Sequence, residues 1–189
     1  GEKVIGESKV HLKVFDTDGK WLVRSKEAAI GNFCADAFRI MLNTDIAMIN
    51  GGGIRADIPN GAVTYNTLLS VFPFNNTACT ATMTGAQLLD ALEASAMNAP
   101  LEDGSFMQVS GIRYKINPGL PSPAVMGDDN LISHIGPGQR RVSDVKILHK
   151  ESGEYLPLDL SRIYTIAGIS YNIVDLVSNG IFRHARLLE

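Results

Sequence analysis

Three consecutive glycines stand between an amide and a guanidinium in the segment Asn50–Arg55. Without Cβ atoms, glycines such as Gly52 and Gly53 let a ligand approach the backbone and allow positive φ at a sharp turn, so that peptide N–H groups can face an anion. Arg55 offers a planar fork of donors to a phosphate or carboxylate, and Asn50 offers a donor and an acceptor to the edge of a nucleobase. The segment therefore predicts a site for a small, flat, anionic ligand. A glycine-rich turn beside a solvated arginine is the alternative.

The segments upstream must position this site. Residues 45–49 form a short apolar run, which predicts a buried strand that ends at Asn50. From Ala28 onward, apolar residues recur at helical spacing and predict a helix whose core stripe contains Ile30, Phe33, Cys34, Ala37, Phe38 and Met41. Arg24 stands just ahead of this helix. By itself it would be a solvated charge or a partner for Glu27.

Strands and capped helices are predicted for much of the remaining chain. Alternating and apolar runs predict strands at residues 9–15, 77–83, 108–116, 142–148 and 163–169. Thr64 and Thr84 can each cap a helix, and Gln87 completes a capping box with Thr84. Ser110-Gly111 interrupts one strand as a bulge or a close backbone approach. Residues 171–178 predict a short helix that closes the domain.

These elements predict an α+β fold with a mixed β-sheet of about five or six strands and helices packed on it. The 189 residues, 45% of them hydrophobic, suit a single domain over residues 1–189. Residues 117–141 are rich in Pro and Gly and show no period of 2 or 3.6. They indicate a mobile insertion, or else a lid or a partner surface. Cys34 and Cys79 are expected to be ordinary thiols rather than a disulfide.

Charge and hydropathy limit the partners. The formal net charge of -3 comes without a long run of either sign, so a nucleic acid polymer is not expected as a ligand. No apolar stretch approaches the roughly 20 residues of a membrane span. A small molecule is therefore the expected ligand.

Several ordered motifs resemble the C-terminal domain of the 5'-nucleotidase family, which includes UDP-sugar hydrolases and 2',3'-cyclic-nucleotide phosphodiesterases. They are Arg24-Ser-Lys-Glu27, Gly31-Asn32, Ala35-Asp-Ala37, Asn50–Arg55, Val71-Phe-Pro-Phe74 and Phe106-Met-Gln-Val-Ser-Gly111. The resemblance implies a domain that grips the base and sugar of a nucleotide. It also implies that Arg24 helps to hold the substrate and, with Arg55, offsets the charge of its phosphate.

Aromatic stacking on the nucleobase is a further implication of the resemblance. Phe74 is the candidate ring, with Asn75 beside it as a weaker candidate for binding. The family usually carries a Gly-Gly-Asp-Gly-aromatic stretch near the end of the domain, where this chain has Ser178-Asn-Gly-Ile-Phe182. Phe182 is therefore the candidate for the second ring, whereas the motif does not support Asp175 as the acid that binds the sugar.

The residue pattern lacks the groups that hydrolysis needs. A two-metal phosphoesterase uses several His, Asp and Asn ligands, but the histidines are scattered without paired spacing: His11, His134, His149 and His184. No nucleophile elbow, Walker loop or Rossmann fingerprint occurs. We expect no catalytic residue, metal site or cofactor in this chain. The resemblance implies a divalent metal pair in a separate N-terminal metallophosphoesterase domain upstream.

The first functional hypothesis is a nucleotide-binding module that is not catalytic by itself and that positions a phosphate for hydrolysis by that N-terminal domain. A stand-alone binding or protein-interaction module with this fold is one alternative, and a substrate domain for a non-nucleotide ester is another. Because many bacterial members of the family are exported, a periplasmic or extracellular location, including the cell surface, is expected.

Overall fold

The computed structural model describes residues 3–174 and 186–187. Helices and 3-10 helices are η1 (Leu22–Arg24), α1 (Ala29–Met41), η2 (Gly51–Gly53), α2 (Tyr65–Val71), α3 (Gly85–Ser95) and α4 (Ser170–Ile173). Strands are β1 (Val4–Ser8), β2 (Ile46–Asn50), β3 (Gly61–Thr64), β4 (Ala78–Thr84), β5 (Met107–Ser110), β6 (Ile112–Ile116), β7 (Ala124–Met126), β8 (Ile132–Ile135), β9 (Val142–Leu148), β10 (Tyr155–Pro157), β11 (Ile163–Ile169) and β12 (Arg186–Leu187).

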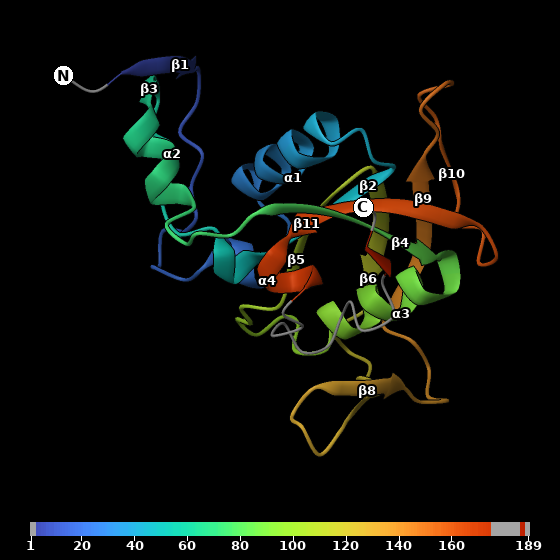
Figure 1. Ribbon diagram of the computed structural model, residues 1–189. Helices are drawn as coiled ribbons and strands as arrows, with labels where there is room; N and C mark the ends of the chain where they lie inside the picture. Colours follow the sequence, from blue (N-terminus) through green and yellow to red (C-terminus); the bar gives the residue numbers. More distant parts are fainter. Residues whose placement is uncertain (1–2, 175–185, 188–189) are drawn as a thin grey trace.

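The central sheet has five strands in the order β12-β4-β11-β2-β5. Strands β2 and β11 are parallel, and the other neighbours are antiparallel. Helix α1 covers one face of the sheet and α3 the other (Figure 1). A second sheet, β10-β9-β6, continues from β5 after a turn at Gly111. The predicted α+β class with a mixed sheet is confirmed.

Strand β2 lies in the middle of the core and is buried along its whole length. Ile46 and Met48 pack in the cluster under α3, whereas Ile49 packs in the cluster that contains Cys34 of α1. Burial on both faces explains why this segment is a continuous apolar run rather than an alternating one. The strand ends at Asn50, directly before η2.

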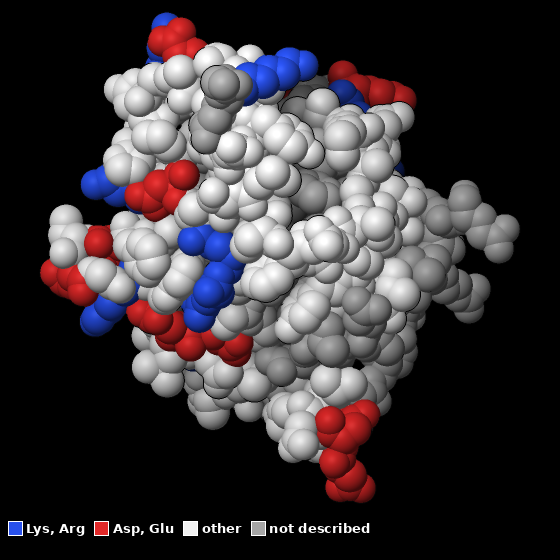
Figure 2. Space-filling view, turned by 60° about the vertical axis from the view of Figure 1, so that its left-hand side comes forward, with Lys and Arg blue, Asp and Glu red and all other residues white. Residues whose placement is uncertain are grey.

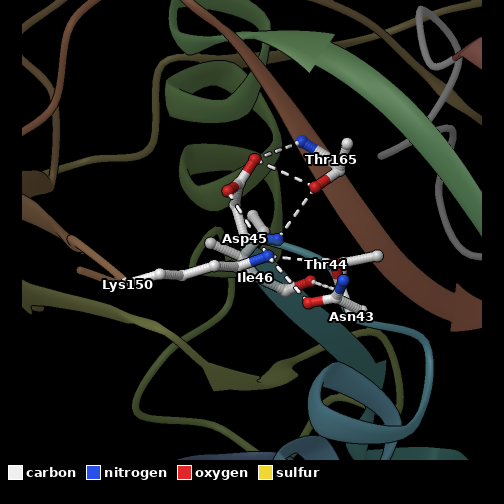
Figure 3. A network of polar contacts seen from close by, with 6 residues as sticks. All are labelled: Asn43, Thr44, Asp45, Ile46, Lys150 and Thr165. Carbon is white, nitrogen blue, oxygen red and sulfur yellow. Dashed lines mark hydrogen bonds and ion pairs between the residues drawn. The ribbon is translucent and has the colours of Figure 1, made fainter. Parts of the chain in front are cut away.

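A polar network fixes the other end of β2 (Figure 3). Asp45 Oδ2 accepts hydrogen bonds from the Thr165 backbone N–H at 2.8 Å and from its hydroxyl at 2.9 Å. The Thr165 hydroxyl oxygen in turn accepts from the Asp45 N–H at 2.8 Å. Lys150 Nζ donates to the Asn43 carbonyl at 2.9 Å and lies 3.9 Å from Asp45 Oδ1. These bonds hold β2 in register with β11 and therefore set where Asn50 emerges.

Both predicted helix caps are present. Thr64 Oγ1 accepts from the Thr67 N–H at 3.1 Å at the start of α2. Thr84 Oγ1 accepts from the Gln87 N–H at 3.2 Å, and Gln87 Oε1 accepts from the Thr84 N–H at 2.9 Å, which completes the capping box of α3. The predicted break at Gly111 is also confirmed, because its φ is 75° and a Cβ there would lie 2.3 Å from the Asp45 carbonyl oxygen.

Two buried charged side chains join α3 to the chain near β9. Glu93 accepts from the backbone N–H groups of residues 141 and 142 at 2.8 and 2.9 Å. The Arg141 guanidinium donates to the carbonyls of Ala96 and Met97, which follow the last turn of α3, and to that of Ala99. Since backbone groups form hydrogen bonds with each charged side chain, Glu93 and Arg141 together order the loop that leads from α3 toward β5.

The N-terminal strand is not where the alternation predicts it. Residues 9–15 form only isolated bridges, Leu12 with Ile58 and Phe15 with Trp21. The chain turns back at Asp16, whose carboxylate accepts a hydrogen bond from the Lys20 N–H at 2.9 Å. The turn prevents these residues from forming a longer β-ladder. The strand at this end of the chain is β1, which pairs with β3.

The structure adds an element in one segment and corrects the expectation for another. Within residues 117–141 the structure contains the β7–β8 hairpin, which projects from the body of the molecule (Figure 1). Its strands are too short, and too irregular in register, to show a period in the sequence. Phe33, Ala37 and Met41 of the predicted helix stripe are exposed, because the buried side of α1 consists of Ile30, Gly31, Cys34 and Ala35. The predicted helix over residues 171–178 begins with α4, and its last part lies outside the described residues.

Candidate functional site

A cavity of about 510 Å³ opens beyond the carboxyl end of β2. Its lining consists of Arg24, Asn50, Gly52, Gly53, Arg55, Phe74, Asn76, Asp103, Gly104, Ser105, Ile169 and Tyr171. The main site residues predicted from the sequence, from Arg24 to Phe74, therefore line one cavity. Phe182 lies outside the described residues.

Gly51 and Gly52 serve packing rather than an anion cradle. The Gly51 N–H donates to the Phe106 carbonyl at 2.7 Å, and the Gly52 N–H donates to the Gly104 carbonyl at 2.9 Å. None of Gly51, Gly52 and Gly53 has positive φ. A Cβ at Gly51 would lie 1.8 Å from the Val23 carbonyl oxygen, and one at Gly52 would lie 2.9 Å from the Gly104 carbonyl oxygen. The expectation of positive φ is wrong for all three glycines, and the expectation of free amides is wrong for Gly51 and Gly52, because close contact with two neighbouring segments uses these two glycines instead.

Asn50 is buried at the inner end of the cavity, and its amide oxygen has no hydrogen-bond partner among the described residues. Its Nδ2 donates to the Gly104 carbonyl at 3.1 Å, and its backbone N–H donates to Asn172 Oδ1 at 3.5 Å. Asn50 Oδ1 and Asn172 Nδ2 are both buried and have no hydrogen-bond partner among the described residues. An unsatisfied buried polar atom costs about 1–3 kcal/mol. This end of the strand therefore leaves an acceptor and a donor for which a ligand or water could compensate.

Two guanidinium groups give the cavity a positive wall. Neither Arg24 nor Arg55 forms an ion pair with a described residue. Arg55 Nη1 donates a long hydrogen bond of 3.4 Å to the Gly52 carbonyl. Partial burial, followed by the charge of Arg55, lowers the pKa of Arg24 from its ordinary value. An anionic group in the cavity would relieve this repulsion.

On the face in Figure 2, the described Lys and Arg residues stand in small groups, several of them beside Asp and Glu. This mixed pattern suits a compact anion better than an extended polyanion. The positive charge that matters for a ligand is the local charge at the cavity.

Two aromatic rings stand on the cavity wall. Phe74 is 54% exposed and Tyr171 is 39% exposed, so both have free ring surface. Ser170 joins their segments, because its N–H donates to the Thr77 carbonyl at 2.9 Å and its hydroxyl accepts from the Thr77 N–H at 3.2 Å. Exposed rings in a concave site can stack on a flat ligand. Tyr171 is absent from the sequence prediction. It lies just after β11, in the same way that the glycine loop lies just after β2, the parallel neighbour of β11.

The structure also corrects and extends the polar lining. Asn76 lines the cavity, whereas the predicted weaker candidate Asn75 is exposed and does not. The loop before β5 adds Asp103, Gly104 and Ser105. Asp103 Oδ1 accepts from the Ser105 N–H at 2.8 Å and from its hydroxyl at 2.7 Å, which shapes this loop. No local sequence signal marks these loop residues, because they reach the cavity only through the pairing of β5 with β2.

The described residues contain neither a cluster of metal ligands nor a helix of membrane-spanning character. Across residues 3–174 and 186–187, no three His, Cys, Asp or Glu side chains are grouped so as to hold a metal ion. His11 lies 2.8 Å from Asp57, away from the cavity, and His184 is outside the described residues. No helix in this part of the chain has the length and apolar character needed to cross a bilayer.

The fold of this chain is shared with solved proteins. The crystal structure of a 5'-nucleotidase precursor from Thermus thermophilus matches with a TM-score of 0.77 and 31% identity, over 98% of this chain and 33% of that one. The family model described as "5'-nucleotidase, C-terminal domain" matches residues 4–176. The chain therefore belongs to the 5'-nucleotidase C-terminal domain family.

Curated relatives of this chain include larger proteins. Trifunctional nucleotide phosphoesterase protein YfkN of Bacillus subtilis is 44% identical over 96 residues, which are 49% of this chain and 7% of that protein. Cell wall protein Lmo0130 of Listeria monocytogenes is 36% identical over 103 residues, which are 49% of this chain and 13% of that protein. The chain thus spans only a small part of the length of these relatives.

Proposed function

We propose that this chain is the nucleotide-binding domain of a metal-dependent phosphoesterase of the 5'-nucleotidase type. The observation that carries the proposal is that one cavity collects exposed aromatic rings, a buried amide with a free acceptor and two guanidiniums that form no ion pair within the described chain. Arg24 and Arg55 would bind the phosphate, Phe74 would stack on the base, and Asn50 would meet a polar edge of the ligand. Tyr171 would supply a further ring surface.

The hydrolytic step would belong to another part of the polypeptide. We propose that a metallophosphoesterase domain upstream of this chain holds a divalent metal pair, which would activate water and polarise the phosphate. The present residues would contribute orientation of the substrate, through contacts made away from the reacting phosphorus. The name of the cell wall relative supports a periplasmic or extracellular location, with the cell surface as one form of it.

The direct test is an NMR chemical-shift titration of the 189-residue chain with adenosine, AMP, uridine and UDP-glucose. We expect saturable shifts around the cavity with at least one nucleotide. Asn50→Ala, Arg55→Ala and Phe74→Ala should weaken them, and Arg55→Ala should affect phosphate-bearing ligands more than nucleosides. Folding of each variant is checked by its amide spectrum.

Two exposed residues away from the cavity provide matched controls. Phe33→Ala removes a ring that is 49% exposed on α1, and Arg113→Ala removes an exposed guanidinium on β6. Both should bind as the wild type does. If a folded wild-type chain showed no shifts with any of the four ligands at millimolar concentration, the nucleotide proposal would be wrong, and a protein-interaction role or a non-nucleotide ester would replace it.

A further inference from the structure

Trp21 lies beside both arginines of the cavity without lining the cavity itself. The Arg24 guanidinium carbon is 4.1 Å from the centroid of the Trp21 ring, and that of Arg55 is 5.0 Å from the same centroid. These distances are within the range of cation–π attraction. Two cations that come from different segments, η1 and the loop after η2, thus share one indole.

Neither arginine forms an ion pair within the described chain, although the charges of Glu102 and Asp103 act on Arg24. Arg55 also lies 6.0 Å from the Phe74 ring, but the indole is the ring that both guanidiniums contact. Glu102 Oε1, on the neighbouring loop, accepts the Trp21 backbone N–H at 3.1 Å. The Asp103 carboxylate is bonded to Ser105 instead. A carboxylate would hold two guanidiniums more strongly, but it would also cancel the charge that a phosphate needs. An aromatic face holds cations and leaves their charge unneutralised.

The indole is itself held in place. Its ring packs against Phe15 with a centroid distance of 4.2 Å. The backbone around it is tied across the Asp16 turn, because the Leu22 N–H donates to the Val14 carbonyl at 2.8 Å. The bond from the Trp21 N–H to Glu102 also fixes it to the loop that carries Gly104 into the cavity. Trp21 therefore occupies a defined position relative to the cavity wall.

We propose that Trp21 is a positioning residue that holds Arg24 and Arg55 at the mouth of the cavity as an unneutralised pair for a terminal phosphate or pyrophosphate group. The inference rests on the proposed function only for the identity of the full ligand. Trp21 with its two arginines would bind any compact phosphate anion, whether or not a base is attached.

The test compares Trp21→Leu and Trp21→Phe with the wild-type chain by calorimetric titration against AMP, adenosine and sodium pyrophosphate. Tyr155→Leu is the matched control, since it removes the cation–π contact of 3.9 Å that Arg113 makes away from the cavity. We expect Trp21→Leu to weaken AMP and pyrophosphate about fivefold to tenfold. Adenosine affinity should stay within about twofold. Trp21→Phe should recover part of the loss, and Tyr155→Leu should change nothing.

A second readout follows the arginines directly. In the wild-type chain, the indole ring current should move the Arg24 Nε–H proton resonance upfield, and that shift should disappear in Trp21→Leu while the amide spectrum keeps its dispersion. An unchanged Arg24 resonance, or equal losses of AMP and adenosine affinity, would overturn the positioning role.

The outcomes separate this inference from the proposed function. Pyrophosphate binding that depends on Trp21, without any adenosine binding, would support the positioning role and contradict nucleotide recognition. Nucleotide binding that is indifferent to Trp21→Leu would do the reverse. Binding of none of the three probes by the wild-type chain would overturn both.

Discussion

The two ends of strand β2 differ in how their polar groups are paired. At the amino end, the Asp45 carboxylate and the Thr165 hydroxyl exchange hydrogen bonds with each other and with backbone groups. At the carboxyl end, Asn50 Oδ1 and Asn172 Nδ2 are buried without a partner among the described residues, and Arg24 Nε is in the same state. Both ends belong to one strand that is buried throughout.

The difference separates the end of β2 that stabilises the fold from the end that can bind a ligand. Paired polar groups at the amino end lower the free energy of the folded chain and fix the register. Unpaired groups at the carboxyl end raise it, and among them Asn50 and Arg24 line the cavity in which a ligand could satisfy them. We therefore expect substitutions at the first end to change stability and those at the second end to change binding.

The largest expected effect is that of Asp45→Ala. The substitution leaves the Thr165 N–H and hydroxyl without their acceptor, so we expect the free energy of unfolding to fall by about 2–3 kcal/mol. Urea denaturation followed by circular dichroism measures this change. Asp128→Ala, at an exposed carboxylate on the β7–β8 turn, should change it by less than about 0.5 kcal/mol. Equal effects of the two substitutions would remove the contrast between the ends of β2.

Phe74→Ala should act on binding instead. The ring is exposed, so the free energy of unfolding should stay within about 0.5 kcal/mol of the wild type. The dissociation constant for a base-containing ligand should rise about tenfold, because a stacking contact contributes about 1–3 kcal/mol. Titration calorimetry and urea denaturation of the same sample test both halves of this prediction. A loss of stability without a loss of affinity would assign Phe74 to the core.

Asn50→Ala should give a smaller, mixed effect. Loss of the bond from Nδ2 to the Gly104 carbonyl should lower the free energy of unfolding by about 1 kcal/mol, and removal of the unpaired Oδ1 offsets part of that loss. The rise in melting temperature that a saturating nucleotide produces should shrink at the same time. Differential scanning calorimetry with and without AMP measures both. A full ligand-induced rise in the variant would show that the free acceptor plays no part in binding.

The smallest expected effect concerns Cys34, which packs in the cluster behind the carboxyl end of β2. Burial raises the pKa of its thiol to about 12. The unfolded thiol ionises at lower pH, so the contribution of Cys34 to stability is complete below its ordinary pKa and is lost as the pH rises toward 12. From the ordinary thiol pKa of 9.0, we expect urea denaturation to show a loss below about 1 kcal/mol between about pH 8 and pH 9.5. Cys34→Ala should have a shallower slope over this range.

Local signals in the sequence predict the elements that local chemistry determines. The caps at Thr64 and Thr84 and the close approach at Gly111 each follow from a few neighbouring residues, and all are present. The run that ends at Asn50 is predicted because burial on both faces leaves a continuous apolar pattern. In contrast, β1 depends on pairing with β3, which lies far along the chain. The alternating pattern in residues 9–15 therefore predicts a strand in the wrong place.

The candidate site likewise contains residues that local motifs predict and residues that only tertiary contacts bring to it. Six motif residues that are predicted to act together do line one cavity: Arg24, Asn50, Gly52, Gly53, Arg55 and Phe74. Asp103 and Tyr171 reach that cavity through tertiary pairing, and sequence spacing does not reveal it. The glycines show a further limit: their pattern marks a close approach of backbones, but the sequence does not say whether a ligand or the protein itself makes that approach.

The position of Trp21 has an optical consequence. It is the only tryptophan of the chain, so the intrinsic emission above that of tyrosine comes from one place, beside both guanidiniums. Arrival of an anion at those groups changes the electric field across the excited indole and should shift or quench its emission. The protein thus carries its own unlabelled reporter, and stopped-flow fluorescence could resolve how fast a phosphate enters and leaves the cavity.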